Sequence, residues 1–263
     1  MPAGGIGLRG EGEMRRTRWR WVLLVVGATL LLVGGGLVSR WLLLPGPPLA
    51  EARAALASDD RVLVRRLAWW EFRPAVAAPR AGLVFYPGAF VDPVAYAPAA
   101  RELAQRQFLV AVVPMPLGIA LLGSERAAGV MAATPEVSRW AVGGHSLGGV
   151  AAAAFARRHP ELVRGLVLWA SYPNGPDDLS RQPIAVVSVF GEFDPLTSPA
   201  RARAAARQLP PDTRFVEIAG GNHSQFGWYA DQPRDVPARI SRAEQQAQVI
   251  AATAELLERI ARS

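Results

Sequence analysis

The stretch AVGGHSLGGVAAAAFA, residues 141–156, decides the fold of this chain. A short apolar run leads into G-H-S-L-G (144–148), and an alanine-rich segment that favours a helix follows it. This pattern predicts a buried strand, a sharp turn and a helix, with Ser146 projecting from the turn. Glycine on both sides of the serine avoids side-chain clashes in such a turn. We therefore predict that Ser146 is a catalytic nucleophile.

The same turn predicts how negative charge on a reacting oxygen would be stabilised. A helix that begins at Ser146 directs its first N–H groups and its positive dipole end toward that oxygen. The N–H of Leu147 is the first predicted donor. The second is expected in the loop of YPGAF (86–90), where a Pro-Gly pair frees the backbone to turn. Ala89 is the first candidate there and Phe90 the second.

A serine nucleophile needs a general base, and the chain has three histidines. His145 lies within the turn itself and cannot reach back to its neighbour. His159 falls at the far end of the predicted helix, about 20 Å from the nucleophile. His223, in GGNHSQFG after the last predicted strand, is the base that we predict. In this arrangement the base follows the nucleophile and the acid in chain order.

The acid that orients the imidazole is expected between these two positions, at the end of a strand. Asp194, in GEFDPLTSP, fits best, because it ends the strand before the last helix and strand. Glu192 would lie on the same side of that strand but deeper. Asp177 and Asp178, after the preceding strand, are a second possibility.

The rest of the chain alternates between apolar strands and helices. The expected strands are 62–72 (one or two strands), 81–90 (a strand that runs into a Pro-Gly turn), 108–116, 139–145, 165–173, 184–194 and 214–223 (the last strand and its loop). The expected helices are 93–107, 124–135, 146–160, 199–210 and 241–261. Continuous apolar strands alternating with helices predict an α/β fold, with a mostly parallel sheet covered by helices on both faces.

An uncharged run of 19 residues, from Trp21 to Ser39, precedes this domain. As a helix it would span roughly the ~30 Å core of a bilayer. Four arginines lie just before it and only Arg40 close behind, which places the N-terminus in the cytoplasm. The run is longer than the apolar part of a cleaved signal peptide, and the glycines at 34–36 disfavour a buried soluble helix.

The predicted organisation therefore combines one membrane anchor with one extracytoplasmic domain. Its parts are a cytoplasmic N-terminus (1–20), a transmembrane anchor (21–44), a linker (45–60) and an α/β domain (61–263). Cleavage of the anchor as a signal peptide remains the alternative.

Composition narrows the classes of partner. The net charge is +7, but the basic residues, all arginine, are scattered among acidic ones, so we expect no nucleic-acid binding. Cysteine is absent, which excludes disulfides and thiolate metal ligands. The three histidines form no ligand cluster, and the sequence contains neither G-x-G-x-x-G nor a P-loop. We expect no metal and no cofactor.

At these motifs the chain resembles the α/β-hydrolase superfamily. It is most similar to compact bacterial members of the dienelactone-hydrolase-like and esterase type. The resemblance covers roughly 62–261 and is carried by YPGAFVDPVAYAP, GGHSLGGVAAAAFA, GEFDPLTSP and GGNHSQFGWYADQPRDVPARIS. It implies an α/β-hydrolase fold and a cofactor-free hydrolase of carboxylic esters or related acyl bonds. The family roles would fall on Ser146, Asp194 and His223, and on the N–H groups of Leu147 and Ala89.

Two departures from the family bear on the substrate. Dienelactone hydrolases use cysteine as the nucleophile, so their substrate is not implied here. The connection over 171–183 is too short for a cap domain, which predicts an open site and a small or short-chain acyl substrate. Phe90, Phe226 and Trp228 are the predicted substrate-binding residues, although aromatics after His223 could instead pack on the final helix.

Two other functions stay open on the sequence. One is an acyltransferase that uses the same three residues, with an alcohol replacing water. The other is a binding protein that retains the fold without catalysis.

Overall fold

The computed structural model describes residues 44–263, together with 21, 22, 24–27 and 29. Residues Pro45–Ser263 form one compact unit. The predicted N-terminus over 1–20 lies outside the described residues, and so does most of the predicted anchor over 21–44. In the part of the chain that the structure describes, no helix is both long enough and apolar enough to cross a bilayer.

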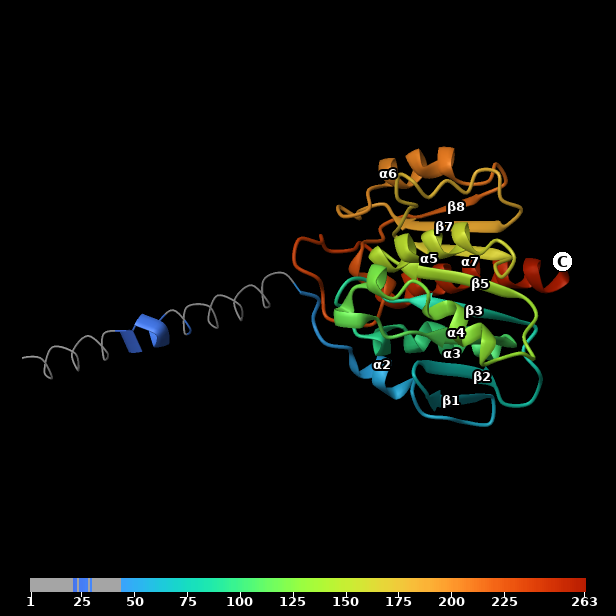
Figure 1. The fold of residues 1–263 in the computed structure, drawn as a ribbon, viewed down its shortest axis with the longest axis horizontal. Helices are drawn as coiled ribbons and strands as arrows, with labels where there is room; N and C mark the ends of the chain where they lie inside the picture. Colours follow the sequence, from blue (N-terminus) through green and yellow to red (C-terminus); the bar gives the residue numbers. More distant parts are fainter. Residues whose placement is uncertain (1–20, 23, 28, 30–43) are drawn as a thin grey trace, which may run out of the picture. The chain divides into compact units, whose positions relative to one another are not determined.

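The compact unit is built on one eight-stranded sheet with the order β1-β2-β4-β3-β5-β6-β7-β8 (Figure 1). The strands are β1 (Val62–Arg66), β2 (Trp70–Pro74), β3 (Ala81–Tyr86), β4 (Phe108–Val112), β5 (Trp140–His145), β6 (Gly165–Trp169), β7 (Ala185–Gly191) and β8 (Arg214–Ile218). From β4 to β8 all neighbours are parallel, whereas β1 pairs with β2, and β2 with β4, in antiparallel fashion. The segment predicted as one or two opening strands therefore forms two.

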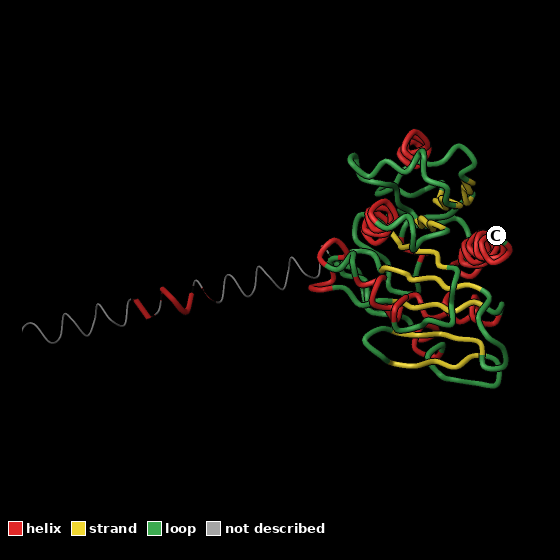
Figure 2. The backbone as a smooth tube through the Cα atoms, turned by 45° about the vertical axis from the view of Figure 1, so that its right-hand side comes forward, coloured by secondary structure: helices red, strands yellow, loops and turns green. Residues whose placement is uncertain are grey.

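Helices cover both faces of the sheet, as predicted (Figure 2). They are α2 (Ala50–Ala54), α3 (Ala97–Gln105), α4 (Arg126–Ala132), α5 (Leu147–Arg158), α6 (Pro199–Ala204) and α7 (Arg242–Arg262). The apolar sides of α3 and α7 pack in one core, and those of α4 and α5 pack in the other. The central strands β3 to β7 are buried throughout, because each core covers one of their faces.

The segment predicted as a linker, 45–60, is an ordered part of this unit. It contains α2, whose sequence AEARA favours a helix. Before α2 the chain forms an isolated bridge between Pro48 and Tyr229. The N–H of Leu49 donates to the carbonyl of Trp228 (2.9 Å), and the N–H of Ala230 donates to the carbonyl of Pro47 (3.0 Å). The prolines of this segment thus belong to an extended stretch that pairs with another loop.

The parallel strands bring several loops to one edge of the sheet. The loops after β3, β4, β5, β6, β7 and β8 all leave from the carboxyl ends of their strands, and we call this side the carboxyl edge. Parallel α/β sheets bind their ligands at that edge, because backbone groups and loop side chains converge there. The predicted site residues all belong to these loops, apart from Leu147, which begins α5.

Candidate active site

Ser146 occupies a strained turn between β5 and α5. Its backbone dihedrals are φ 51° and ψ −122°, which non-glycine residues rarely adopt. Its N–H donates to the carbonyl of Trp169 on the next strand (2.9 Å). A Cβ on Gly144 would lie 2.3 Å from the carbonyl carbon of Gly148, and one on Gly148 would lie 2.1 Å from the carbonyl oxygen of Tyr86. Both flanking glycines are therefore required by space.

Asp194 and His223 form a buried pair. The Nδ1 atom of His223 lies 2.7 Å from Oδ2 of Asp194, and the two residues are 1% and 2% exposed. The other carboxylate oxygen, Oδ1, accepts the N–H groups of Leu196 (2.8 Å) and Thr197 (2.7 Å). The aspartate is thus held by hydrogen bonds on both oxygens, and one of them fixes the orientation of the imidazole.

The other carboxylates weighed from the sequence make different contacts. Glu192 is exposed and accepts a backbone N–H from the loop after β8 (2.8 Å). Asp178 is exposed and accepts the N–H of the residue two positions later (2.9 Å). Of the candidates for the acid, Asp194 is the one that the structure brings to His223.

His145, which sequence reasoning set aside as a base, lies directly beside His223. The two ring centroids are 4.5 Å apart, and the other side of His145 stacks on Phe226 at 5.6 Å with an interplanar angle of 14°. Burial, followed by the charge of His223, lowers the pKa of His145 well below its ordinary value. His145 is therefore a neutral ring packed against the predicted base.

A buried tyrosine connects His145 to the loop after β3. The hydroxyl oxygen of Tyr96 accepts the N–H of Gly88 (3.0 Å) and lies 2.9 Å from Nδ1 of His145. The Tyr96 hydroxyl thus connects the backbone of the loop after β3 with the imidazole of His145. Neither spacing nor periodicity in the sequence signalled this contact, which joins residues 49 positions apart.

The backbone donors predicted for the oxyanion differ in availability. The N–H groups of Ala89 and Leu147 have no hydrogen-bond acceptor among the described residues. The N–H of Phe90 donates to the carbonyl of Gly118 (2.8 Å), so it is occupied. Ala89, the first candidate, is therefore the free donor of the two in that loop.

The three predicted substrate-binding aromatics lie in different environments. Phe90 is 48% exposed, with a positive φ of 60°. Phe226 is fully buried against His145, as expected from packing rather than from a pocket wall. Trp228 is partly exposed, and its N–H donates to the carbonyl of Ala95 (2.7 Å).

The loop that carries His223 is fixed by polar side chains that the sequence did not single out. Asp235 accepts the N–H of Ser224 (2.6 Å). The buried side chain of Gln245, on α7, accepts the N–H of Asn222 (3.0 Å) and donates to its carbonyl (2.8 Å). These bonds satisfy the backbone on both sides of the histidine and hold its position.

The remaining predictions concern groups away from the site. His159, at the far end of α5, contacts Glu125 through Nε2 (2.8 Å), as a surface residue at a helix end would. Over the described ranges, no three His, Asp or Glu side chains are grouped so that they could hold a metal ion.

Comparison with known proteins relates this geometry to a family. The alpha/beta hydrolase family matches residues 82–247, which include all three predicted catalytic residues. No curated protein matches the chain.

Solved structures repeat the fold at low sequence identity. The esterase domain from a Rhodothermus marinus protein superimposes with a TM-score of 0.59 at 16% identity, over 76% of this chain and 99% of that one. A thermophilic esterase from Thermogutta terrifontis gives 0.53 at 16% identity, over 76% and 94%. A dienelactone hydrolase-like promiscuous phosphotriesterase from metagenomic libraries gives 0.56 at 18% identity, over 76% and 99%.

Proposed function

The chain belongs to the alpha/beta hydrolase family, and from that premise we propose that it cleaves carboxylic esters through an acyl-enzyme on Ser146. In this proposal His223 is the general base and Asp194 orients it. The N–H groups of Ala89 and Leu147 form the oxyanion hole. No cofactor takes part.

The proposed reaction has two halves that use the same groups. In the first, Nε2 of His223 takes the proton of the Ser146 hydroxyl as its oxygen attacks the ester carbonyl carbon. The two backbone N–H groups stabilise the oxyanion, and the imidazolium returns the proton to the departing alcohol. In the second half, water loses a proton to His223 and attacks the acyl-enzyme. The acid is released and the proton returns to Ser146.

One observation carries the proposal. The imidazole of His223 is held on Nδ1 by buried Asp194, and its ring packs at 4.5 Å against His145, the residue before Ser146. A base held on one nitrogen, next to a strained serine and two free N–H donors, is the arrangement that acyl transfer requires.

Covalent labelling tests the nucleophile. A fluorophosphonate probe should modify the wild type at Ser146, and Ser146→Ala should abolish both labelling and ester hydrolysis. Ser138→Ala is the matched control, since this exposed serine precedes β5 at the opposite end of the same strand. Undiminished labelling of Ser146→Ala would move the nucleophile elsewhere and contradict the proposal.

We also propose that residues 21–44 anchor the protein in a membrane with the hydrolase domain outside the cytoplasm. The support is the uncharged run at 21–39 and the arginines before it. Protease added to spheroplasts should digest the domain and spare a tag at Met1. Digestion of the tag with protection of the domain would reverse the orientation.

A further inference from the structure

Four large apolar side chains are exposed on two touching loops of the carboxyl edge. They are Phe90 (48% exposed), Leu117 (82%), Leu121 (50%) and Leu122 (58%), and we call them the apolar rim. The loop after β4 contributes three of them within PMPLGIALLG (114–123), which has no charged residue. Exposed large apolar groups that are scattered singly need no explanation, but several on two linked loops, one of which carries the predicted oxyanion donor Ala89, indicate a contact surface.

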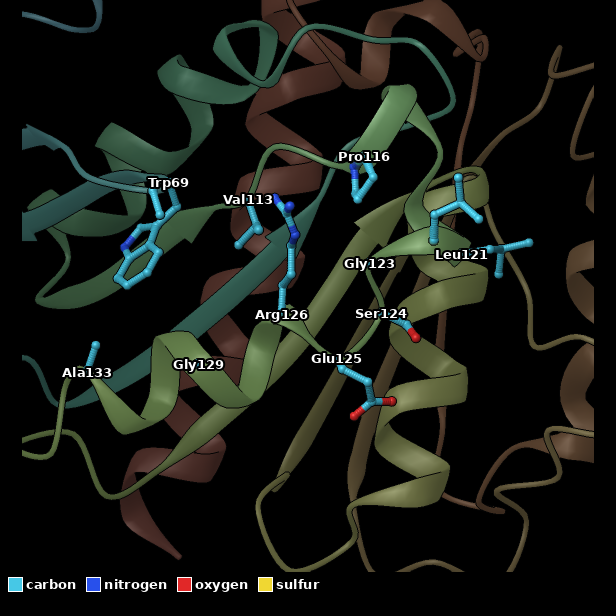
Figure 3. A pocket seen from close by; sticks show the side chains of 12 residues that line it. Trp69, Val113, Pro116, Leu121, Gly123, Ser124, Glu125, Arg126, Gly129 and Ala133 are labelled. Carbon is cyan, nitrogen blue, oxygen red and sulfur yellow. The ribbon is translucent and has the colours of Figure 1, made fainter.

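A cavity of about 820 Å³ opens beside the rim (Figure 3). Its lining is largely apolar and includes Trp69, Val113 and Pro116 as well as the two rim residues Leu121 and Leu122. Trp69 and Leu121 lie at opposite ends in this view. A volume of this size is within the range of pockets that hold apolar small molecules. The rim therefore borders a surface that can receive acyl chains.

A series of backbone hydrogen bonds joins the rim to the N-terminal end of the compact unit. Phe90 donates its N–H to the carbonyl of Gly118, which links the two rim loops (2.8 Å). The chain from Phe90 leads to Ala95, whose carbonyl accepts the N–H of Trp228 (2.7 Å). Next to Trp228, Ala230 donates its N–H to the carbonyl of Pro47 (3.0 Å). In Figure 1 the blue segment that opens the unit lies at the same end as the loop after β8.

The length of chain between this point and the uncharged run limits their separation. Pro45 follows Ser39 by six residues, which span at most about 22 Å when fully extended. A compact unit of this size measures about 45 Å across. The segment from Ser39 to Pro45 is therefore shorter than the compact unit is wide, and Pro45 lies at the carboxyl edge.

We propose that the apolar rim rests on the lipid bilayer and that the site takes its ester from that surface. This inference rests on the proposed esterase function and on the proposed anchor. A bilayer that covers the carboxyl edge would exclude water from the site. The proposal therefore also accounts for the short connection between β6 and β7, which has no cap. In this proposal the substrate is an ester that partitions into lipid, in place of the small or short-chain acyl compound that the sequence predicts.

Fluorescence quenching tests the contact in the full chain. Because the protein has no cysteine, Leu121→Cys gives a single labelling site for an environment-sensitive fluorophore. Reconstitution into phosphatidylcholine vesicles with nitroxide-labelled lipid should quench this probe at least twofold. The control is Leu162→Cys, between α5 and β6 at the opposite edge (37% exposed), which should change little.

Three outcomes would overturn the proposal. Absence of quenching at residue 121 would show that the rim does not reach lipid. Equal quenching at residues 121 and 162 would show that the contact is not specific to this edge. A spectral shift that needs no vesicles and grows with protein concentration would assign the rim to a second copy of the chain.

Activity assays then distinguish a role of the apolar rim in access to substrate from the role of the proposed catalytic residues. The rate on a long-chain p-nitrophenyl ester in vesicles is divided by the rate on p-nitrophenyl acetate in solution. The double variant Leu121→Asp, Leu122→Asp should lower this ratio about tenfold, and Leu162→Asp should keep it. A wild type inactive on both esters would contradict the proposed function. An active wild type with an unchanged ratio in the double variant would contradict only the proposed contact of the apolar rim with lipid.

Discussion

Two loops of the carboxyl edge, one after β8 and one after β4, are held in opposite ways. The first carries His223, and its backbone is fixed by the buried side chain of Gln245 on α7 and by Asp235 within the same loop. The second carries the leucines of the apolar rim, and it is organised by short-range turns between neighbouring backbone groups. We call the loop after β8 the inward loop, because His223 in it is buried, and the loop after β4 the outward loop, because its leucines are exposed.

The outward loop is also conformationally strained. Leu117 has a φ of 52°, a left-handed conformation that costs about 1–2 kcal/mol for a residue with a Cβ. Its side chain is nonetheless 82% exposed and gains little from burial. The two loops therefore have different roles: the loop after β8 fixes the position of His223, and the loop after β4 presents an apolar surface.

The largest effect should come from removing the imidazole of His223 in the inward loop. His223→Ala removes the proposed base and should lower kcat by a factor of about 10³ or more, because members of such a triad act as a unit. Steady-state kinetics on p-nitrophenyl acetate measures the loss. His159→Ala, at the far end of α5, should change kcat less than twofold. Comparable losses in both variants would point to a general folding defect.

The sequence pointed to residues that the structure brings together, Asp194 and His223, but to little of what holds them in place. The glycines around Ser146 and the strand ends that carry Asp194 and His223 have local signatures, since turns and strand termini are encoded by neighbouring residues. The contact between Tyr96 and His145 joins buried groups from separate elements, and no periodicity encodes it. This contact is determined by how the two elements pack in the folded protein.

The outward loop was predicted only in part for a similar reason. The apolar run over 108–116 was expected to be one buried strand, but β4 ends at Val112 and the following residues turn. Apolar residues after a strand end look alike in sequence whether they become buried or exposed. Only the tertiary structure shows that Leu117, Leu121 and Leu122 point outward.

A smaller effect should follow from cutting the hydrogen bonds behind the site. Tyr96→Phe removes the acceptor for the N–H of Gly88 and the hydrogen-bond partner of Nδ1 of His145. We expect kcat to fall about tenfold with little change in KM, because the adjacent N–H of Ala89 would act mainly on the transition state. Stopped-flow acylation with a chromogenic ester measures this step.

Tyr229→Phe is the matched control for that experiment. This tyrosine is equally buried and follows His223 in the same loop, but its hydroxyl does not contact His145 or Gly88. It should retain kcat within about twofold. An equal loss in both variants would mean that Tyr96 contributes through packing alone.

The smallest effect concerns stability against acid, and it tests whether the inward packing keeps His145 neutral. Burial lowers the pKa of His145 in the folded state, whereas in the unfolded chain it titrates near 6.5. Below pH 6.5 the unfolded chain therefore binds a proton that the folded chain does not, and the free energy of unfolding falls with falling pH. The slope from this group is at most about 1.4 kcal/mol per pH unit.

Urea unfolding of the full chain between pH 5 and 7.5, above the range in which most carboxylates titrate, should show a shallower slope in His145→Gln than in the wild type. Identical slopes in His145→Gln and the wild type would show that His145 is protonated in the folded protein, contrary to the neutral ring that the packing around Ser146 requires.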